Sequence, residues 1–320
     1  MKYLFLVLLI FVSSAHLAAQ SDTAIIYLDG NEKPCPEDKA TRYAIQIKEK
    51  DYWKKVVFDI SDDKPIWGAH FADYACTLFD GPYTAFNKKQ KIITNGRYIN
   101  NKKTGIWKSF ANDGKLIDSA LYRDGFIFGI ALTWYNDGSV SDSLFFEKEG
   151  KGTGKGFWPD GKPKDSGSFL RGKKNDLWTY YSKSGIKCQE VKYEADSALS
   201  FICYDETGNV QTDNCYYEKE ATFKGGDKAW LKYLLGKLGA AKYPDAYFQG
   251  RSYGIVYVQF IVGADGKIID AFTINSVDKE LDEIALKIIQ QSPRWEPAVQ
   301  FNRNVKAYRK QPITFSKVEQ

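Results

Sequence analysis

Histidine is the scarcest chemically versatile residue in this chain of 320 residues, which has two, at positions 16 and 70. A metal centre built on paired imidazoles is therefore excluded if the N-terminal segment is removed, and no cysteine pair has zinc-ligand spacing. The Gly-x-Ser-x-Gly elbow of hydrolases is missing too. The sequence predicts a non-enzymatic protein with no catalytic residues, no metal site and no cofactor.

Clustered positive charge is also missing. The net charge of +5 is spread along the chain, and no basic helix or stripe stands out. Proteins that bind nucleic acid usually concentrate lysine and arginine on one face. We therefore expect no nucleic-acid partner.

Long apolar runs are confined to the N-terminus, where Tyr3 to Val12 is apolar and small residues follow. Leu17 and Ala19 suit the positions before a signal-peptidase cut, so residues 1–19 are predicted to be a signal peptide. The alternative is an uncleaved anchor, although a helix of this length spans only about 25 Å of a hydrocarbon core of roughly 30 Å. Either reading puts the body of the chain in the periplasm or cell envelope, anchored to the inner membrane if the segment is retained.

Cysteine is sparse and odd in number, at five. An exported protein with an odd count should keep at least one free thiol. Cys188, Cys203 and Cys215 fall on neighbouring expected strands, which favours one disulfide among them. Small buried thiols are the alternative.

Glycine and aromatic residues, in contrast, are abundant and periodic. Turn glycines recur with spacings of 24, 23, 24 and 23 residues, at Gly114, Gly138, Gly161, Gly185 and Gly208. An aromatic residue stands eight positions after each one: Tyr122, Phe146, Phe169, Tyr193 and Tyr216. Asp-Gly between aromatic-rich runs is a strong hairpin signal, because glycine adopts positive φ without steric cost. About six copies of a hairpin are therefore expected over residues 82–217.

This pattern, including Gly96-Arg-Tyr98, Gly105-Ile-Trp107 and Gly172 through Trp178 to Gly185, resembles MORN-type repeats. The resemblance implies a stack of hairpins with an aromatic ridge. It also implies a scaffold or binding surface rather than an enzyme.

After Tyr217 the period stops and a different order begins. Leu231, Leu234, Leu235 and Leu238 have helical spacing, and Val256, Val258, Phe260 and Val262 alternate as a half-buried strand. Asp265-Gly266 turns that strand back, and a second helix carries Leu281, Ile284, Ala285, Ile288 and Ile289 on one face. A last strand ends at Phe315. The fold class predicted is mainly β, with a C-terminal α+β domain of the order helix, hairpin, helix, strand.

Between about residues 221 and 316 the chain resembles the TonB C-terminal domain, as found in energy transducers of Bacteroidetes-like bacteria. The resemblance is carried by Tyr243-Pro244, Asp265-Gly266, Trp295 and Pro312-Ile313-x-Phe315. It implies that the last strand receives an extended segment of an outer-membrane TonB-dependent receptor or a similar envelope protein. An ExbB–ExbD-like motor is implied as a partner only if the N-terminal segment is retained.

The last strand contains Pro312, which cannot donate to a sheet ladder, so we expect an edge strand. The residues expected to bind the partner are Arg303, Val305, Lys306, Ala307, Tyr308, Arg309, Lys310 and Gln311. Basic residues on an edge also prevent aggregation, which is the alternative role for them. Ala307 is expected to point its N–H toward the partner, but a bulge before Pro312 would give that role to Lys306 instead.

The predicted plan is therefore a signal peptide (1–19), a β-rich segment of unknown role (20–81), hairpin repeats (82–217), a linker (218–227) and a TonB-like domain (228–320). The expected function is binding of an outer-membrane partner by β-strand addition, in TonB-dependent transport. The alternative is a repeat-based periplasmic scaffold that binds protein or glycan and transduces no energy. The chain departs from a typical transducer in having 10 prolines and no proline-rich span.

Overall fold

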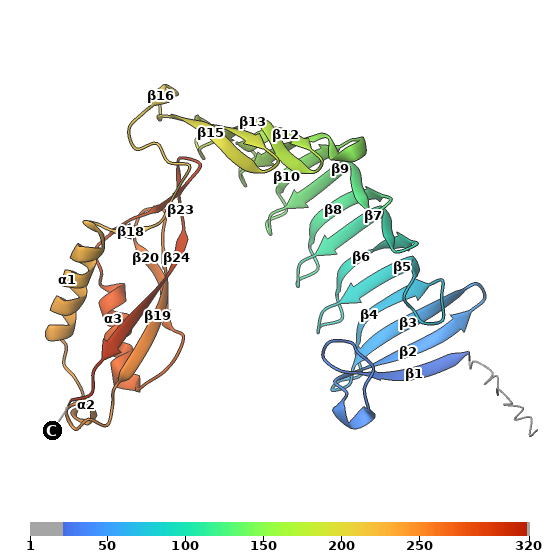
Figure 1. Cartoon of the computed structure of the whole chain (residues 1–320), viewed down its shortest axis with the longest axis horizontal. Coiled ribbons are helices and arrows are strands. Elements are labelled where there is room, and N and C mark those ends of the chain that lie inside the picture. Colours follow the sequence, from blue (N-terminus) through green and yellow to red (C-terminus); the bar gives the residue numbers. More distant parts are fainter. Residues whose placement is uncertain (1–21, 319–320) are drawn as a thin grey trace, which may run out of the picture. The chain divides into compact units, whose positions relative to one another are not determined.

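The structure is a computed structural model that describes residues 22–318. They form two compact units, one ending at Gly138 and the other starting at Ser139. Up to residue 211 the antiparallel strands of both units neighbour one another in chain order (Figure 1). The predicted fold class is confirmed. The expected signal peptide lies outside the described residues, and none of the helices described could span a membrane.

The first unit is a hairpin array. Its strands are β1 (Thr23–Leu28), β2 (Arg42–Glu49), β3 (Tyr52–Asp59), β4 (Pro65–Phe71), β5 (Phe79–Phe86), β6 (Ile92–Ile99), β7 (Lys102–Phe110), β8 (Leu116–Arg123) and β9 (Phe126–Trp134), with a 3-10 helix at Glu37–Lys39. The array thus starts at Thr23, well before the repeat recognised from residue 82. The sequence did not show this because the turn after β3 has Asp63, at φ of 61°, at the position where later turns have glycine.

Two kinds of turn recur along the array. At one end of the strands a three-residue loop ends in a left-handed residue, as where the Gly114 N–H donates to the Ala111 carbonyl. The five predicted turn glycines occupy this position, with φ between 80° and 92°. At the other end two residues suffice, such as Asn100-Asn101, both with positive φ. These two-residue turns match the natural twist of antiparallel strands.

Aromatic rings pack in rows across the strands. In the first unit Trp107 lies 4.9 Å from Tyr98 and 5.8 Å from Tyr83, measured between ring centroids. Gly96 makes room for the indole, since a Cβ there would meet the Trp107 ring at 2.2 Å. Gly167 and Trp178 repeat the arrangement in the second unit. Several small clusters of packed rings therefore stabilise the array in place of one large core.

The second unit continues the array and adds the C-terminal region. Its array strands are β10 (Val140–Phe146), β11 (Gly152–Phe157), β12 (Pro163–Leu170), β13 (Lys173–Tyr181), β14 (Lys187–Glu194), β15 (Ser197–Tyr204) and β16 (Val210–Gln211), with a 3-10 helix at Lys148–Gly150. A disulfide joins Cys203 to Cys215, and Cys188 is a buried free thiol.

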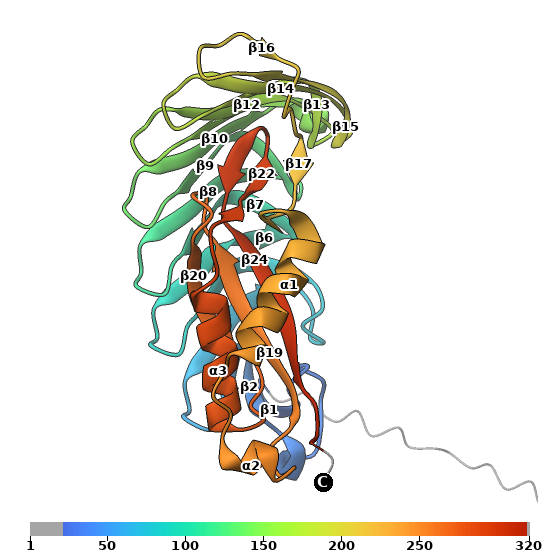
Figure 2. The same cartoon turned by 90° about the vertical axis from the view of Figure 1, so that its left-hand side faces the viewer.

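The C-terminal region follows the predicted order. Its elements are β17 (Glu218–Lys219), β18 (Thr222–Phe223), α1 (Gly226–Gly239), α2 (Asp245–Phe248), β19 (Gly254–Val262), β20 (Ile268–Thr273), α3 (Lys279–Gln290), β21 (Trp295–Glu296), β22 (Ala298–Gln300), β23 (Arg303–Val305) and β24 (Ala307–Phe315). Helices α1 and α3 lie on one face of the sheet β20-β19-β24 (Figures 1 and 2). The core between them contains Phe260, Leu281 and Ile313.

Two expectations about this region need correction. The stripe of α1 that faces the core contains Trp230 and Leu234, whereas Leu231 and Leu235 are 56% and 61% exposed. Tyr233 and Leu238 pack on the same side as Trp230 and Leu234, so Leu231 and Leu235, each one position further along, lie outside the buried stripe. Residues 218–227, expected as a linker, contain β17 and β18, which pair with β22 and β21.

Candidate partner-binding edge

Strand β24 is the edge of its sheet. It pairs with β19 over nine consecutive residues, from Val262–Ala307 to Gly254–Phe315, without a bulge. In the part of the chain that the structure describes, no strand pairs with its other side. Pro312 lies inside it opposite Tyr257, as the sequence predicted for an edge strand.

The hydrogen bonds of Tyr257 decide which backbone groups of β24 point outward. Its N–H donates to Asn275 Oδ1 at 2.7 Å, and its carbonyl accepts from the Ile274 N–H at 3.0 Å, both on the β20 side. Tyr257 therefore has no backbone group directed at β24. In an antiparallel pair its partner, Pro312, must then turn its own backbone away from β19.

This parity extends along the whole strand because the register is unbroken. Tyr308, Lys310 and Thr314 share the parity of Pro312, so their N–H groups face the open edge. Ala307 has the opposite parity and belongs to the inner ladder with Val262. The expectation that Ala307 offers its N–H to a partner is therefore wrong. Lys306 does not take over the role, because it lies between β23 and β24 and outside both.

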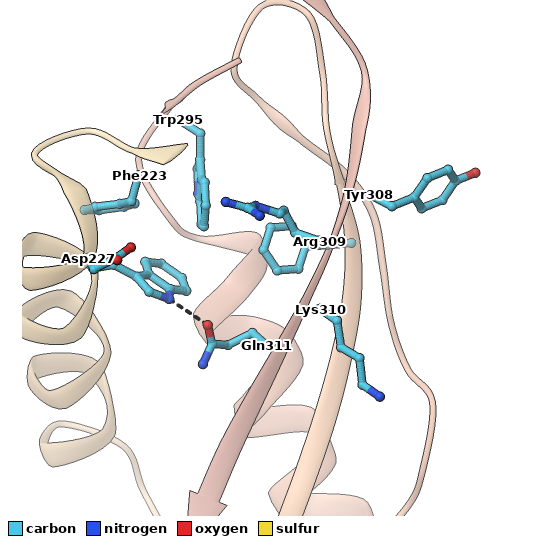
Figure 3. A pocket seen from close by; sticks show the side chains of 9 residues that line it. Phe223, Asp227, Trp295, Tyr308, Arg309, Lys310 and Gln311 are labelled. Atoms are coloured by element: carbon cyan, nitrogen blue, oxygen red, sulfur yellow. Dashed lines mark hydrogen bonds between the residues drawn. The ribbon is translucent and has the colours of Figure 1, made fainter. Parts of the chain in front are cut away.

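A pocket of about 210 Å³ lies beside this edge. Figure 3 shows that Arg309 and Gln311 point toward α1, whereas Tyr308 and Lys310 point to the other side of the sheet. The pocket is lined by Phe223, Asp227, Trp230, Phe260, Trp295, Tyr308, Arg309, Lys310 and Gln311. A strand added at the edge would therefore alternate its side chains between this pocket and the opposite face.

Internal hydrogen bonds fix the pocket-facing side chains. Trp230 Nε1 donates to Gln311 Oε1 at 2.7 Å. The Arg309 guanidinium donates to Glu220 Oε2 at 2.9 Å and to the carbonyl of Ala221, which is fully buried. Arg309 and Gln311 therefore shape the edge, and their polar groups are largely committed within the chain.

The side chains on the opposite face are freer. The Tyr308 side chain is 71% exposed, and the Lys310 ammonium lies 4.3 Å from the centroid of the Tyr257 ring. Lys306 is exposed as well. Tyr308 and Lys310 are thus the predicted residues with both a side chain and an outward N–H available.

Two predicted residues are used elsewhere. Val305 lies on β23, pairs with Ala298 and packs against the core. The Arg303 side chain donates to the carbonyls of Tyr181 and Lys164, at 3.1 and 3.3 Å, on the hairpin array. The sequence reading missed Trp230 and Asp227 of the pocket. The single tryptophan in α1 was the available signal, because a large indole in a small domain is usually buried near a polar partner.

Comparison with known families agrees with this architecture. Residues 240–316 match the family described as Gram-negative bacterial TonB protein C-terminal. The chain carries a TonB C-terminal domain. This TonB domain implies a place in the cell envelope and, in general terms, interaction with outer-membrane receptors. It covers the edge strand, the pocket wall formed by β24, and helix α3.

The other comparisons add little. A search of curated proteins gave no match. Among solved structures, a mutant of S. aureus TarM in complex with Fondaparinux, alpha-GlcNAc-glycerol and UDP is 15% identical, with a TM-score of 0.19. A second TarM structure is 16% identical with a TM-score of 0.18, and each match covers 40% of this chain and 21% of the other. Scores this low carry no argument about fold or function.

Proposed function

We propose that this protein is a non-enzymatic envelope protein whose TonB domain binds an outer-membrane receptor by β-strand addition along β24. The observation that carries the proposal is the outward backbone of Tyr308 and Lys310 on an unbroken edge strand. Backbone groups of an edge supply affinity to an extended peptide, while the flanking side chains fix its register. The family match at residues 240–316 supports the same role.

The hairpin array is proposed to be MORN-type and to act as the carrier of the TonB domain. Its two-strand period and its left-handed turn residues support this reading. If residues 1–19 are retained as an anchor, the protein would serve nutrient import as a transducer. If they are removed, it would act as a periplasmic adaptor. Transport is the proposed context in both cases.

Proline substitutions test the proposed edge. Tyr308→Pro removes an outward N–H, so binding of receptor segments should weaken by about 0.5–1.5 kcal/mol while the ladder with β19 survives. Ala307→Pro removes an inward N–H and should lower the melting temperature instead. The measurement is titration of the full chain with periplasmic segments of outer-membrane receptors from the same cell, alongside thermal melts.

Tyr308→Ala is the matched control, because it removes the phenol and keeps the N–H. It should bind more tightly than Tyr308→Pro. Equal binding by the parent and both proline variants, all with normal melts, would show that β24 is only a protected edge.

A further inference from the structure

The short hairpin formed by β22 and β23 makes a second, unexpected contact. Its two-residue turn, Phe301-Asn302, lies against the last strands of the hairpin array. Phe301 stacks on Tyr180 with ring centroids 3.8 Å apart and planes at 7°, and meets Tyr217 edge-on at 5.3 Å. The stacked distance is short enough to exclude water between the two rings.

Backbone and side-chain hydrogen bonds hold the same turn. The N–H of Phe301 donates to the Tyr217 carbonyl at 2.8 Å, and the N–H of Asn302 donates to the Tyr216 carbonyl at 3.1 Å. The Asn302 side-chain amide is within 3.3 Å of the carbonyls of Cys188 and Tyr204. The turn therefore leaves few of its polar groups without a partner on the array.

The conformation of Phe301 shows that the contact matters to the fold. Its φ is 53° and that of Asn302 is 55°. Asparagine tolerates this left-handed region, whereas a bulky aromatic residue rarely occupies it. A hairpin turn exposed to water would be served better by Asn-Gly. Phe301 is held in this conformation by its ring contacts.

The disulfide adjoins, in sequence, the segment that receives the turn. Cys215 immediately precedes Tyr216 and Tyr217, whose carbonyls accept the two turn N–H groups. Its partner Cys203 is fully buried on β15. The bond thereby ties the accepting segment to the array across a separation of 12 residues.

We propose that the β22–β23 hairpin is a plug that holds the TonB domain on the end of the array, and that the Cys203–Cys215 disulfide keeps its socket in place. The socket consists of Tyr180, Cys188, Tyr204, Tyr216 and Tyr217. Disulfides persist in oxidising compartments such as the periplasm and are rare in the cytosol. The TonB domain should thus be seated in the oxidised chain and released in the reduced one. This holds whether or not β24 binds a receptor.

The reactivity of the Cys188 thiol can report whether the plug is seated in its socket. Its Sγ lies 3.3 Å from the carbonyl oxygen of Tyr180 and 3.5 Å from that of Phe301, so its single S–H is shared between two acceptors. Burial raises the pKa of the thiol, and the thiolate is the form that reacts. The seated plug should therefore protect Cys188 from alkylation.

The test measures maleimide labelling of Cys188 in the full exported chain. Cys35→Ser and Cys76→Ser remove the other free thiols. In this background Phe301→Ala should speed labelling by about tenfold or more, because an aromatic pair and its burial are lost. Replacing both Cys203 and Cys215 by serine should speed it comparably. Asn304→Ala, an exposed position on the same hairpin, should change nothing.

Hydrogen exchange in the background chain gives an independent reading that needs no change at the turn. The amide of Phe301 should be protected in the oxidised chain and exchange freely once both Cys203 and Cys215 are serine. Fast labelling of Cys188 before any change at the plug or disulfide would overturn the docked arrangement. Slow labelling that persists with both serines would overturn the role of the disulfide.

Discussion

Single residues in left-handed conformation close many of the turns that join the strands of the array. Gly114 and Gly161 close their turns at φ of 92° and 80°, and Asp63 does so at 61°. Glycine pays little for this conformation, whereas other residues are strained by contact of Cβ with the backbone. A periodic glycine therefore marks a turn in the sequence. The earlier turns could not be predicted because other residue types stand at this position.

Gly161→Val tests this at one turn. No atom lies within 4 Å of an added Cβ, so the Cβ itself causes no clash and the backbone conformation is the expected source of the loss. We expect the free energy of unfolding to fall by about 1–3 kcal/mol. Chemical denaturation followed by tryptophan fluorescence measures it. Gly161→Asn is the control, since asparagine tolerates positive φ, and an equally large loss there would contradict the explanation.

At the scale of elements, the side chains of β24 alternate between the two faces of its sheet. Arg309 reaches toward α1 and is held by Glu220, while Lys310 faces the opposite side of the sheet. Adjacent basic residues thus have different roles, one in the fold and one at the surface. The sequence could give their alternation but not which parity faced the helices and the open edge.

Charge reversal should separate the two roles. Lys310→Glu should slow association with an acidic extended peptide, and the effect should shrink as salt rises, because exposed charges are screened over about 10 Å at 0.1 M. Arg309→Glu should instead lower the melting temperature, because it removes the bonds to Glu220 and the Ala221 carbonyl. Stopped-flow binding and thermal melts provide the readouts. Equal effects of the two changes on both readouts would contradict this division.

At the scale of the whole molecule, the array is a long chain of local contacts that ends in a TonB domain. Within the array, β1 to β16, each strand pairs with its sequence neighbour. The β22–β23 hairpin adds a contact of another kind to the array, since Phe301 meets Tyr180 across more than a hundred residues of sequence. Such contacts form only in the folded chain, and no periodicity in the sequence predicts them.

The N-terminus provides the prediction at this scale. We expect the exported protein to begin near Gln20 and to be recovered in the soluble periplasmic fraction. Intact-mass measurement of the protein purified from cells decides the point. A full-length chain found only with the inner membrane would favour the anchored transducer.

The sequence by itself determined the hairpin array after residue 82, the order of elements in the TonB domain and the edge character of β24. These follow from local rules: turn chemistry, alternation along a strand and the missing N–H of Pro312. Tertiary structure alone decided the outward parity of Tyr308 and Lys310, the pocket beside Trp230, and the use of Arg303 on the array. Those features depend on strand register and on contacts between residues that are distant in sequence. Both form only in the folded chain.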